Sequence, residues 1–399
     1  NPNDIVVIWS TLKTTVESIV NYRVVKESFQ YTSGNSFLFV NVNKNEKRDQ
    51  YIHSVVLHNL KPGAKYEYIC GSRFSWSKMF WFVVPTNNTV RLAIFGDMGY
   101  KNATSLPYLT TDVSKKMYDA IFHLGDIAYD LYMGNGRVAD KFMELIQPIA
   151  AHVPYMVCPG NHEEYKNYRH YKKLFKMPGT SEGLWYSFNL GPAHFISIST
   201  EVYYLAQFKI NLINDQYNWL LKDLEGITAT HCDRTHPWII MYGHRPMYCS
   251  NYDNVDCTNH LTLTRVGVTS SHRFGLEELL NIFGVDLVMW AHVHSYERSW
   301  PVYDYEVYNG SYEEPYHNPR APVHINVGSG GTRFSKTTFR AYIPEWSAYR
   351  TAYQGYMRMQ IFNETHLYLE QISVDEEGLL LDNFYYYEIV YYPFKENRT

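Results

Sequence analysis

Two histidines separated by one residue come directly after a strongly apolar run. The run covers residues 285–290, and His292 and His294 follow it. Such a run predicts a buried strand, and if strand geometry continues through Val293, both imidazoles point to the same side. Imidazole binds borderline metal ions, so the two histidines could be metal ligands. An isolated pair of this kind is more often an ordinary strand end, and its interpretation depends on the rest of the chain.

Four further apolar runs end in side chains that can bind metal. The runs cover residues 91–95, 119–124, 154–158 and 237–241, and they are followed by Asp97, by Asp126 with Tyr129, by Asn161 with His162, and by His244. Glycines beside these residues let the backbone turn where each strand ends. In an α/β sheet, sites form beyond the carboxyl ends of the strands. Chance could supply one or two such strand ends, but five in one chain indicate a common site.

Carboxylates, imidazoles and a phenolate suit hard or borderline cations such as iron, manganese and zinc. The predicted ligands are Asp97, Asp126, Tyr129, Asn161, His244, His292 and His294. This set exceeds what one ion takes. If one carboxylate bridges, the set satisfies two ions about 3.5–4 Å apart, as in two-metal phosphoryl-transfer sites. Cys158 lies near the site in the sequence, but a single cysteine does not indicate a thiolate cluster.

From residue 90 onward, apolar strands alternate with segments of helical periodicity, which predicts an α/β architecture. Besides the five runs, we expect a hairpin over residues 185–199, a strand over 323–327, an antiparallel pair over 356–373, and a last strand or surface tail over 385–392. Helices are predicted over residues 137–150, 214–224 and 273–283, with Asn214 as a helix cap. These elements make up a predicted catalytic domain from residue 88 to residue 399.

The first 87 residues have a different character. They contain short β-branched and aromatic runs separated by turn residues, which is typical of an all-β sandwich. The segment 60–68, with a Pro-Gly turn followed by alternating tyrosines, resembles the late strands of a fibronectin type III domain. No cluster of chemically reactive residues lies in this domain, so we expect it to pack against or position the catalytic domain.

Composition excludes several classes of function. A formal net charge of -4 and the lack of a Lys/Arg block argue against nucleic-acid binding. No apolar run approaches the roughly 18 residues of a membrane span. The chain begins without Met and without an apolar leader, so we expect a mature or trimmed form.

Two features predict an extracytoplasmic protein, either secreted or lysosomal. Acceptor triplets for N-glycosylation occur at Asn87, Asn102, Asn309, Asn363 and Asn397. Cys249 and Cys257 bracket a polar loop and could close it as a disulfide. Cys70, Cys158 and Cys232 remain unassigned. Because the total is odd, at least one thiol is free or pairs between chains, which leaves a homodimer open.

The five strand ends resemble the five sequence blocks of the calcineurin-like metallophosphoesterases. They read Gly96-Asp-Met-Gly99, Gly125-Asp-Ile-Ala-Tyr129, Gly160-Asn-His-Glu163, Gly243-His244 and Ala291-His-Val-His294. The Gly-Asp-x-x-Tyr variant resembles the purple acid phosphatases in particular, and the resemblance extends to the N-terminal sandwich. It implies a catalytic domain of two β-sheets flanked by helices. Ala291 departs from the pattern, because the family usually has Gly there.

The resemblance also implies a role for each ligand. A ferric ion would be held by Asp97, Tyr129 and His294. A divalent ion (zinc, manganese or iron) would be held by Asn161, His244 and His292. Asp126 would bridge the two ions. The implied activity is acid phosphatase, in which a metal-bound hydroxide attacks a small phosphate monoester.

His162 is the predicted proton donor or phosphate contact, and Asp126 is the second predicted catalytic residue. Relatives often supply a further histidine shortly after the block containing His244, and this chain has none there. His260 and His272 are candidates that the spacing does not decide. Two alternatives remain open: a phosphodiesterase or nucleotide pyrophosphatase with the same ion pair, and a non-catalytic secreted protein that binds iron.

Overall fold

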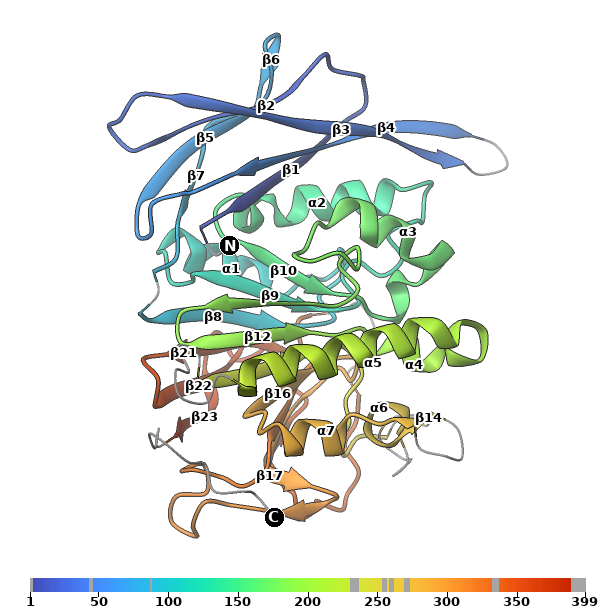
Figure 1. The fold of residues 1–399 in the computed structure, drawn as a ribbon, viewed down its shortest axis with the longest axis vertical. Coiled ribbons are helices and arrows are strands. Elements are labelled where there is room, and N and C mark those ends of the chain that lie inside the picture. The colour runs from blue at the N-terminus through green and yellow to red at the C-terminus, as the bar shows by residue number, and fades with distance from the viewer. Residues whose placement is uncertain are drawn as a thin grey trace.

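The computed structural model describes residues 3–42, 46–86, 88–229, 237–252, 257, 262–268, 273–331 and 337–388 (Figure 1). Its first part is an all-β domain, as the sequence predicts. The strands are β1 (Ile5–Thr11), β2 (Ser18–Val24), β3 (Gln30–Val42), β4 (Lys47–Leu57), β5 (Lys65–Ser72), β6 (Ser75–Trp76) and β7 (Phe80–Val83). They pair in the order β1-β4-β3-β2-β5-β6, with β7 on β5. Every second residue of β5 is buried, which is the pattern of a strand with one face in a core.

The catalytic part contains two larger sheets. The first has the order β10-β9-β8-β21-β22-β23 and consists of β8 (Val90–Phe95), β9 (Ala120–Leu124), β10 (Tyr155–Cys158), β21 (Gly355–Ile361), β22 (His366–Ser373) and β23 (Leu380–Tyr387). The second has the order β11-β12-β13-β16-β19-β17-β18. Its strands are β11 (Tyr186–Leu190), β12 (Ala193–Ser197), β13 (Trp238–Tyr242), β16 (Leu287–Trp290), β17 (Tyr296–Tyr303), β18 (Glu306–Val307) and β19 (Val323–Val327), with β20 (Ser347–Thr351) on β17.

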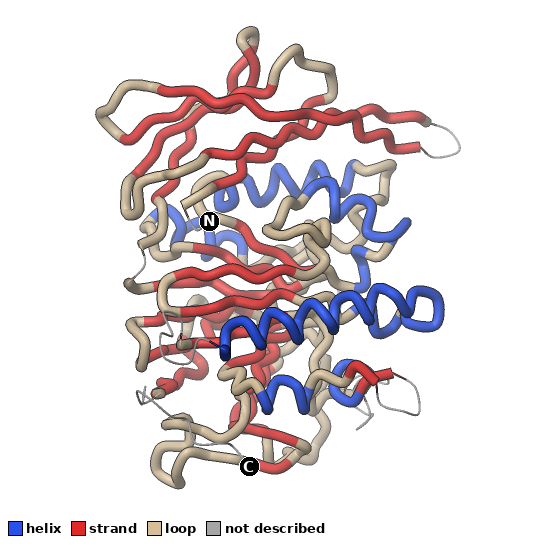
Figure 2. The backbone as a smooth tube through the Cα atoms, in the orientation of Figure 1, coloured by secondary structure: helices blue, strands red, loops and turns tan. Residues whose placement is uncertain are grey.

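The two sheets pack face to face and helices cover their outer faces (Figure 2). Phe122, Trp238 and Met289 belong to the apolar layer between the sheets. The outer face of the first sheet carries α1 (Leu106–Ser114), α2 (Arg137–Ala150) and α3 (Tyr165–Leu174). The second sheet carries α4 (Glu201–Tyr204), α5 (Ala206–Ala229), α6 (Leu263–Val266) and α7 (Glu277–Ile282). This is the predicted sandwich of two sheets flanked by helices. Within the described ranges, no helix is both long and apolar enough to cross a membrane.

Two of the predicted helices have the wrong bounds. The helix predicted over 273–283 begins only at Glu277, because β15 (Arg273–Phe274) pairs with β14 (Gly267–Val268). The helix predicted from Asn214 begins at Ala206. Ile213, the residue before the predicted cap, is fully buried against the second sheet, so tertiary packing extends the helix beyond the local capping signal. The predicted last strand is confirmed up to Tyr387, and residues 389–392 lie outside the described ranges.

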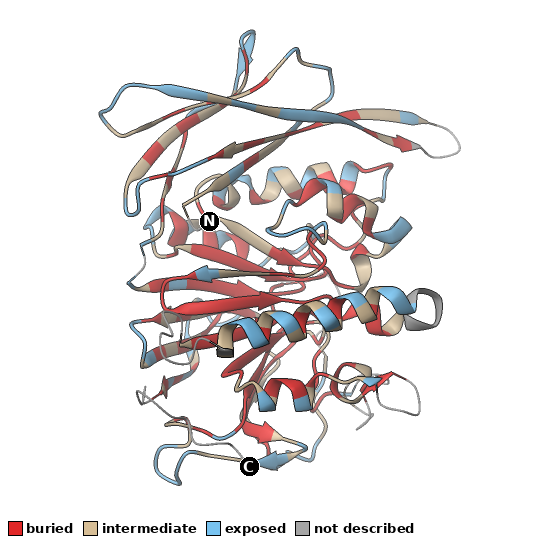
Figure 3. Ribbon diagram, viewed as in Figure 1, coloured by how far each residue is buried: buried red, intermediate tan, exposed pale blue. Residues whose placement is uncertain are grey.

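The N-terminal domain is tied to α2 and α3 by polar contacts. The Asp140 carboxylate on α2 accepts a hydrogen bond from Arg48 and another from Gln50, the latter at 3.0 Å. On α3, His170 Nε2 lies 2.8 Å from Asn41 Oδ1. Figure 1 shows both helices between the N-terminal strands and the first sheet, and the strands β8 and β9 behind them are almost entirely buried (Figure 3). The N-terminal domain therefore braces the helices that follow the loops after β9 and β10.

We expect Asp140→Ala to lower the free energy of unfolding by about 1–3 kcal/mol, because Arg48 and Gln50 would lose their shared acceptor in a partly buried place. Denaturant unfolding followed by fluorescence measures the change. The control is Glu144→Ala, which removes an exposed carboxylate from the same helix. Equal stability of the two variants would show that the contact at Asp140 does not hold the domains together.

Candidate metal centre

The predicted ligands lie at the carboxyl ends of parallel strands. In the first sheet β8 pairs in parallel with β9, and β9 with β10. In the second sheet β13 pairs in parallel with β16. The two sheets meet at this edge, where the Gly96 amide donates to the carbonyl oxygen of Val327 at 2.9 Å. Parallel pairing and this contact therefore bring all five strand ends to one place.

One group of donor atoms comes from Asp97, Tyr129 and His294. Tyr129 Oη lies 3.1 Å from Asp97 Oδ1 and 2.9 Å from His294 Nε2. His294 Nε2 lies 3.4 Å from Asp97 Oδ1. These three atoms form a small triangle, so a single ion could contact all of them. We call this set the tyrosine group.

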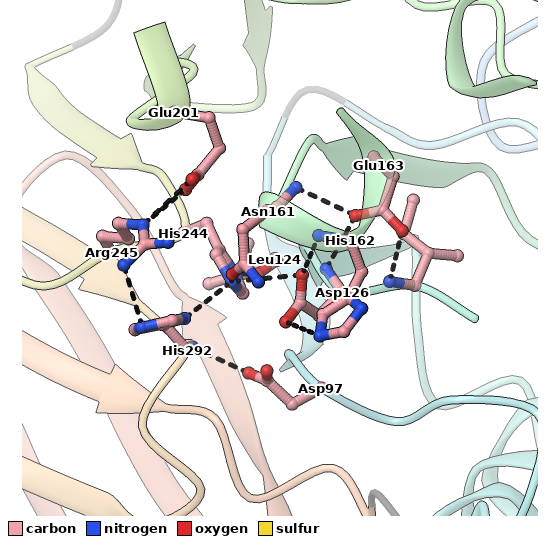
Figure 4. A network of polar contacts seen from close by, with 12 residues as sticks. Asp97, Leu124, Asp126, Asn161, His162, Glu163, Glu201, His244, Arg245 and His292 are labelled. Atoms are coloured by element: carbon pink, nitrogen blue, oxygen red, sulfur yellow. Dashed lines mark hydrogen bonds and ion pairs between the residues drawn. The ribbon is translucent and has the colours of Figure 1, made fainter. Parts of the chain in front are cut away.

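A second group is centred on His244 (Figure 4). His244 Nε2 lies 3.2 Å from Asn161 Oδ1, 3.2 Å from His292 Nδ1 and 3.4 Å from Asp126 Oδ1. Ligand atoms of Asp126, His244 and His292 all lie within 4.8 Å of one another. We call Asn161, His244 and His292, with the Asp126 carboxylate beside them, the histidine group.

Strand geometry does not continue through His292 and His294, and the two imidazoles contact different groups of donor atoms. Strand β16 ends at Trp290, and His292 has a left-handed φ of 67°. The His292 amide donates to Asp97 Oδ2 at 2.8 Å, which holds this turn. As a result His292 reaches the histidine group, whereas His294 reaches the tyrosine group.

The spacing within each group fits a metal ion. Metal–oxygen and metal–nitrogen bonds of about 2.0–2.2 Å place neighbouring donor atoms of one ion roughly 2.8–3.5 Å apart at angles between 90° and the tetrahedral value. The three donor atoms of the tyrosine group lie 2.9–3.4 Å apart. In the histidine group the separations from His244 Nε2 are 3.2–3.4 Å, and the ligand atoms of Asp126, His244 and His292 all lie within 4.8 Å of one another. All donor atoms are oxygen or nitrogen, which suits iron, zinc or manganese. The residues present therefore fit two ions of this kind.

Backbone strain is concentrated at the same residues. Positive φ angles occur at Asp97 (58°), Asp126 (48°) and Tyr129 (53°), as well as at His292. A non-glycine residue in this region costs about 1–3 kcal/mol, and such residues cluster at functional sites. The surrounding sheets must therefore hold these side chains in place against a local preference for other conformations.

The site also buries charge. The side chains of Asp97 and Asp126 are 0% and 2% exposed. Burial opposes ionisation of Asp126, but the neighbouring His244 outweighs it and holds the pKa of the carboxyl well below its usual range. Burial likewise opposes protonation of His244, yet Asp126 raises the pKa of this imidazole to about 10. Positive charge thus stabilises Asp126, and a metal ion would supply such charge in place of an imidazolium.

Glu163 connects two of the loops. Its buried carboxylate accepts hydrogen bonds from the backbone amides of Asp126 at 2.9 Å, Ile127 at 3.0 Å and Gly160 at 2.9 Å. It thereby fixes the loop after β9 to the loop after β10, and it is a structural residue of the site.

His162 lies at the solvent side of this arrangement, with its side chain 26% exposed. Its Nδ1 is 3.1 Å from Asp130 Oδ1, and its Nε2 is 3.9 Å from Asp126 Oδ2. The Asp130 contact was not predicted, although Asp130 follows Tyr129 directly in the sequence. Asp130 accepts from Nδ1 and so turns Nε2 toward the site.

An ion pair that the sequence analysis missed supports the histidine group. Arg245 Nε lies 2.9 Å from Glu201, which is completely buried, and Arg245 Nη1 lies 3.1 Å from His292 Nε2. A signal for the pair existed, because Arg245 adjoins His244 and Glu201 follows the strand end of β12. His260 and His272, the candidates for a further histidine, lie outside the described residues.

The predicted disulfide between Cys249 and Cys257 is present. Cys70 and Cys158 are buried free thiols, and Cys232 lies outside the described residues. Of the predicted glycosylation sites, Asn102 and Asn363 are exposed and Asn309 is partly exposed. Asn87 and Asn397 lie outside the described residues.

Family models match three parts of the chain. Residues 90–296 match the calcineurin-like phosphoesterases, residues 1–84 match the N-terminal domain of purple acid phosphatases, and residues 321–383 match the iron/zinc purple acid phosphatase-like protein C family. The chain is 48% identical over 388 residues to acid phosphatase type 7 of Danio rerio, covering 95% of this chain and 87% of that protein. It is 50% identical over 340 residues to the Mus musculus protein of the same name, covering 84% and 77%.

Among solved structures, purple acid phosphatase PPD1 from yellow lupin (Lupinus luteus) seeds superposes with a TM-score of 0.79 at 24% identity. The match covers 97% of this chain and 72% of that one. At this identity the likeness concerns the fold, and it includes the N-terminal β domain together with the two-sheet sandwich.

Substituting Gly125 tests how tightly the site is built. Gly125 has a φ of 79°, and a Cβ placed there would lie 2.4 Å from His244 Nδ1. We therefore expect Gly125→Ala to displace His244 and to lower the bound metal per protein at least several-fold, with a stability loss of about 1–3 kcal/mol. Elemental analysis and denaturant unfolding measure the two effects.

The matched control is Gly226→Ala. Gly226 lies on α5, and a Cβ there would have no neighbour within 4 Å. Alanine should gain up to about 1 kcal/mol of helix stability at this position and leave the metal content unchanged. Wild-type metal content in Gly125→Ala would contradict the close packing of this loop against His244.

Proposed function

The chain belongs to the purple acid phosphatase family and is a metal-dependent acid phosphatase, and we propose that the tyrosine and histidine groups are the two halves of its metal centre. The observation that carries this proposal is the division of the donor atoms into two compact sets. The atoms of the tyrosine group, and the contacts of His244 Nε2 in the histidine group, have the spacing of ligands around one ion. The Asp126 carboxylate adjoins the histidine group, and its own loop supplies Tyr129. Asp126 is therefore the proposed bridge between the ions.

We assign iron(III) to the tyrosine group and zinc, manganese or iron(II) to the histidine group. A phenolate oxygen is a strong donor to ferric iron, and Tyr129 is the phenol within 3.1 Å of the Asp97 carboxylate. Imidazole and amide ligands suit each of the three divalent ions. The match of the C-terminal residues to an iron/zinc phosphatase family supports the same pair of metals.

Two bound cations would offset the charge of a phosphate ester and lower the pKa of an attacking water. The chain's own residues then have separate tasks. Asp97 and Asp126 supply buried negative charge that would hold the cations, and Glu163 fixes the loop of Asp126 to the loop after β10. His162 points Nε2 toward the site and is positioned to donate a proton to the departing alcohol oxygen at acid pH. Asp130 keeps the His162 ring in this orientation.

We also propose that the protein is located outside the cytoplasm. The Cys249–Cys257 disulfide and the exposed acceptor asparagines Asn102 and Asn363 support a secreted or lysosomal glycoprotein.

The matches of residues 1–84 and 90–296 to separate family models support a division into domains 1–87 and 88–399. Because Cys70 and Cys158 are buried, a disulfide-linked homodimer would have to use Cys232.

The ferric–tyrosinate assignment predicts a coloured protein. Tyr129→Phe should remove the visible charge-transfer band, because phenylalanine has no oxygen to donate to iron. Absorption spectroscopy of the purified protein measures the band. Tyr100→Phe is the control, because Tyr100 follows Asp97 in the sequence but belongs to neither donor group. A wild-type protein that holds iron but lacks a visible band would sink the assignment.

Asp126→Asn tests the bridging role. We expect phosphomonoesterase activity at acid pH to fall at least about 100-fold, because an amide cannot offset the charge of two cations. Asp119→Asn is the matched control. Asp119 comes directly before β9, at the end of the strand opposite to Asp126, and pairs with Arg91.

Full activity of Asp126→Asn would contradict the bridging role. Assays that compare phosphate diesters with phosphate monoesters distinguish a phosphodiesterase from a phosphomonoesterase. Bound iron without turnover of any ester would favour the non-catalytic alternative.

A further inference from the structure

Two partly exposed tyrosines on the loops after β9 and β10 stack on each other. The rings of Tyr132 and Tyr165 have centroids 3.8 Å apart and an interplanar angle of 17°. Tyr165 is 39% exposed and Tyr132 is half-buried. We call these residues the aromatic pair. Large aromatic rings left partly open to solvent, outside any core cluster, are available to contact a ligand.

The pair belongs to the two loops that carry the centre of the site. Tyr132 lies three residues after Tyr129, and Tyr165 lies three residues after His162. Asp130 joins these loops through its 3.1 Å contact with His162 Nδ1. Partial burial, followed by the charge of Asp130, raises the pKa of Tyr132, so its ring stays a neutral phenol beside that carboxylate. The pair therefore belongs to the two loops that meet at the contact between Asp130 and His162.

The backbone around the pair is strained. Asp130 has a φ of 68°, and the three residues after Tyr165 have φ angles of 50°, 60° and 59°. Each left-handed residue costs roughly 1–2 kcal/mol, and strain of this kind marks sites where a side chain must be held in a particular place. Tyr168, the last of the three, is fully buried and anchors the segment.

The segment after Tyr165 is held by contacts with the N-terminal domain. Arg169 Nη2 donates to the carbonyl oxygen of Val40 at 2.7 Å, and His170 meets Asn41. The N-terminal domain thus fixes the start of α3 just behind Tyr165. Lys166 adds positive charge, with its Nζ 5.3 Å from the centroid of the Tyr165 ring. An anionic substrate would meet a cation and an aromatic surface together.

We propose that the aromatic pair is a subsite for the leaving group, which selects phosphate monoesters whose alcohol carries a planar aromatic ring, such as a nucleoside 5′-monophosphate. This proposal rests on the proposed function, because the metal centre fixes where the phosphate lies. In the reaction, the water oxygen forms a new bond to phosphorus and the ester P–O bond breaks. The alcohol oxygen keeps the electron pair and takes a proton. The nucleoside base does not react, and its stacking on the aromatic pair only positions the ester.

The test compares adenosine 5′-monophosphate with ribose 5-phosphate. Both release a primary alcohol from the same position of the sugar, so their intrinsic reactivity is matched and only the base differs. Stacking of one base on an aromatic ring corresponds to about 10-fold in affinity. We expect wild-type protein loaded with iron and zinc to prefer adenosine 5′-monophosphate by about that factor in kcat/KM.

Tyr165→Leu and Tyr132→Leu should each bring this preference close to one, while kcat/KM for ribose 5-phosphate stays within about two-fold of wild type. Tyr165→Phe should keep the preference, because it keeps the ring. Tyr312→Leu is the control, since Tyr312 is 95% exposed and belongs to neither loop.

Equal kcat/KM for the two substrates in wild type would overturn the subsite. The same would follow if Tyr165→Leu lowered both substrates equally, because the pair would then serve only to hold the loops. If metal-loaded wild type hydrolysed neither substrate, nor any other monoester, the proposed function itself would fall, which is distinct from the failure of the subsite alone.

Discussion

The whole site depends on how closely the two sheets approach each other at Gly96. A Cβ on Gly96 would lie 2.2 Å from the Cβ of Ala291, so no side chain fits between the end of β8 and the end of β16. Backbone hydrogen bonds on both sides of Gly96 keep this approach, with its amide donating to Val327 and its carbonyl accepting from Gly330 at 3.0 Å. This contact places Asp97 from one sheet against the His292 amide of the other.

The same contact explains why alanine is tolerated at position 291, where the family usually has glycine. Ala291 is fully buried, and its methyl group occupies the space that Gly96 leaves open. A larger residue at either position would push the sheets apart and open both donor groups, because each group takes side chains from both sheets. The departure from the family pattern therefore leaves the ligand set intact, provided that position 96 remains glycine.

Buried charge and backbone strain at this edge must be compensated by the rest of the fold. Strands β9, β13 and β16 are buried along their whole length, and their apolar side chains fill the layers on both faces of the sheets. Burial of apolar surface contributes about 25 cal/mol per Å². This free energy holds Asp97, Asp126, Tyr129 and His292 in their left-handed conformations. The N-terminal domain adds polar contacts to α2 and α3, the helices that follow the two loops of the aromatic pair.

Much of the fold and of the site was predictable because its signals are local. Each apolar run that ends in Gly-Asp or Gly-His marks both a buried parallel strand and the residue beyond it, so the residues that come together could be named from the chain. The contacts of Asp130, Glu201 and Arg245 could not, although these residues stand close to predicted strand ends, because each contact depends on which loops face each other in the fold. The helix bounds failed for a related reason, since Ile213 and the β14–β15 pair respond to tertiary packing rather than to local capping. The left-handed backbone of His292 also escaped prediction, because apolar periodicity does not report a single residue of this conformation at the end of a strand.

We propose that one buried edge of the two sheets holds two ions, one on either side of Asp126. Anomalous diffraction from crystals of the metal-loaded protein tests this most directly, with data collected at the iron and zinc absorption edges. We predict two peaks about 3.5–4 Å apart, one among Asp97, Tyr129 and His294 and the other among Asn161, His244 and His292. A single peak, or two peaks that do not share Asp126, would contradict a binuclear centre built from the five strand ends.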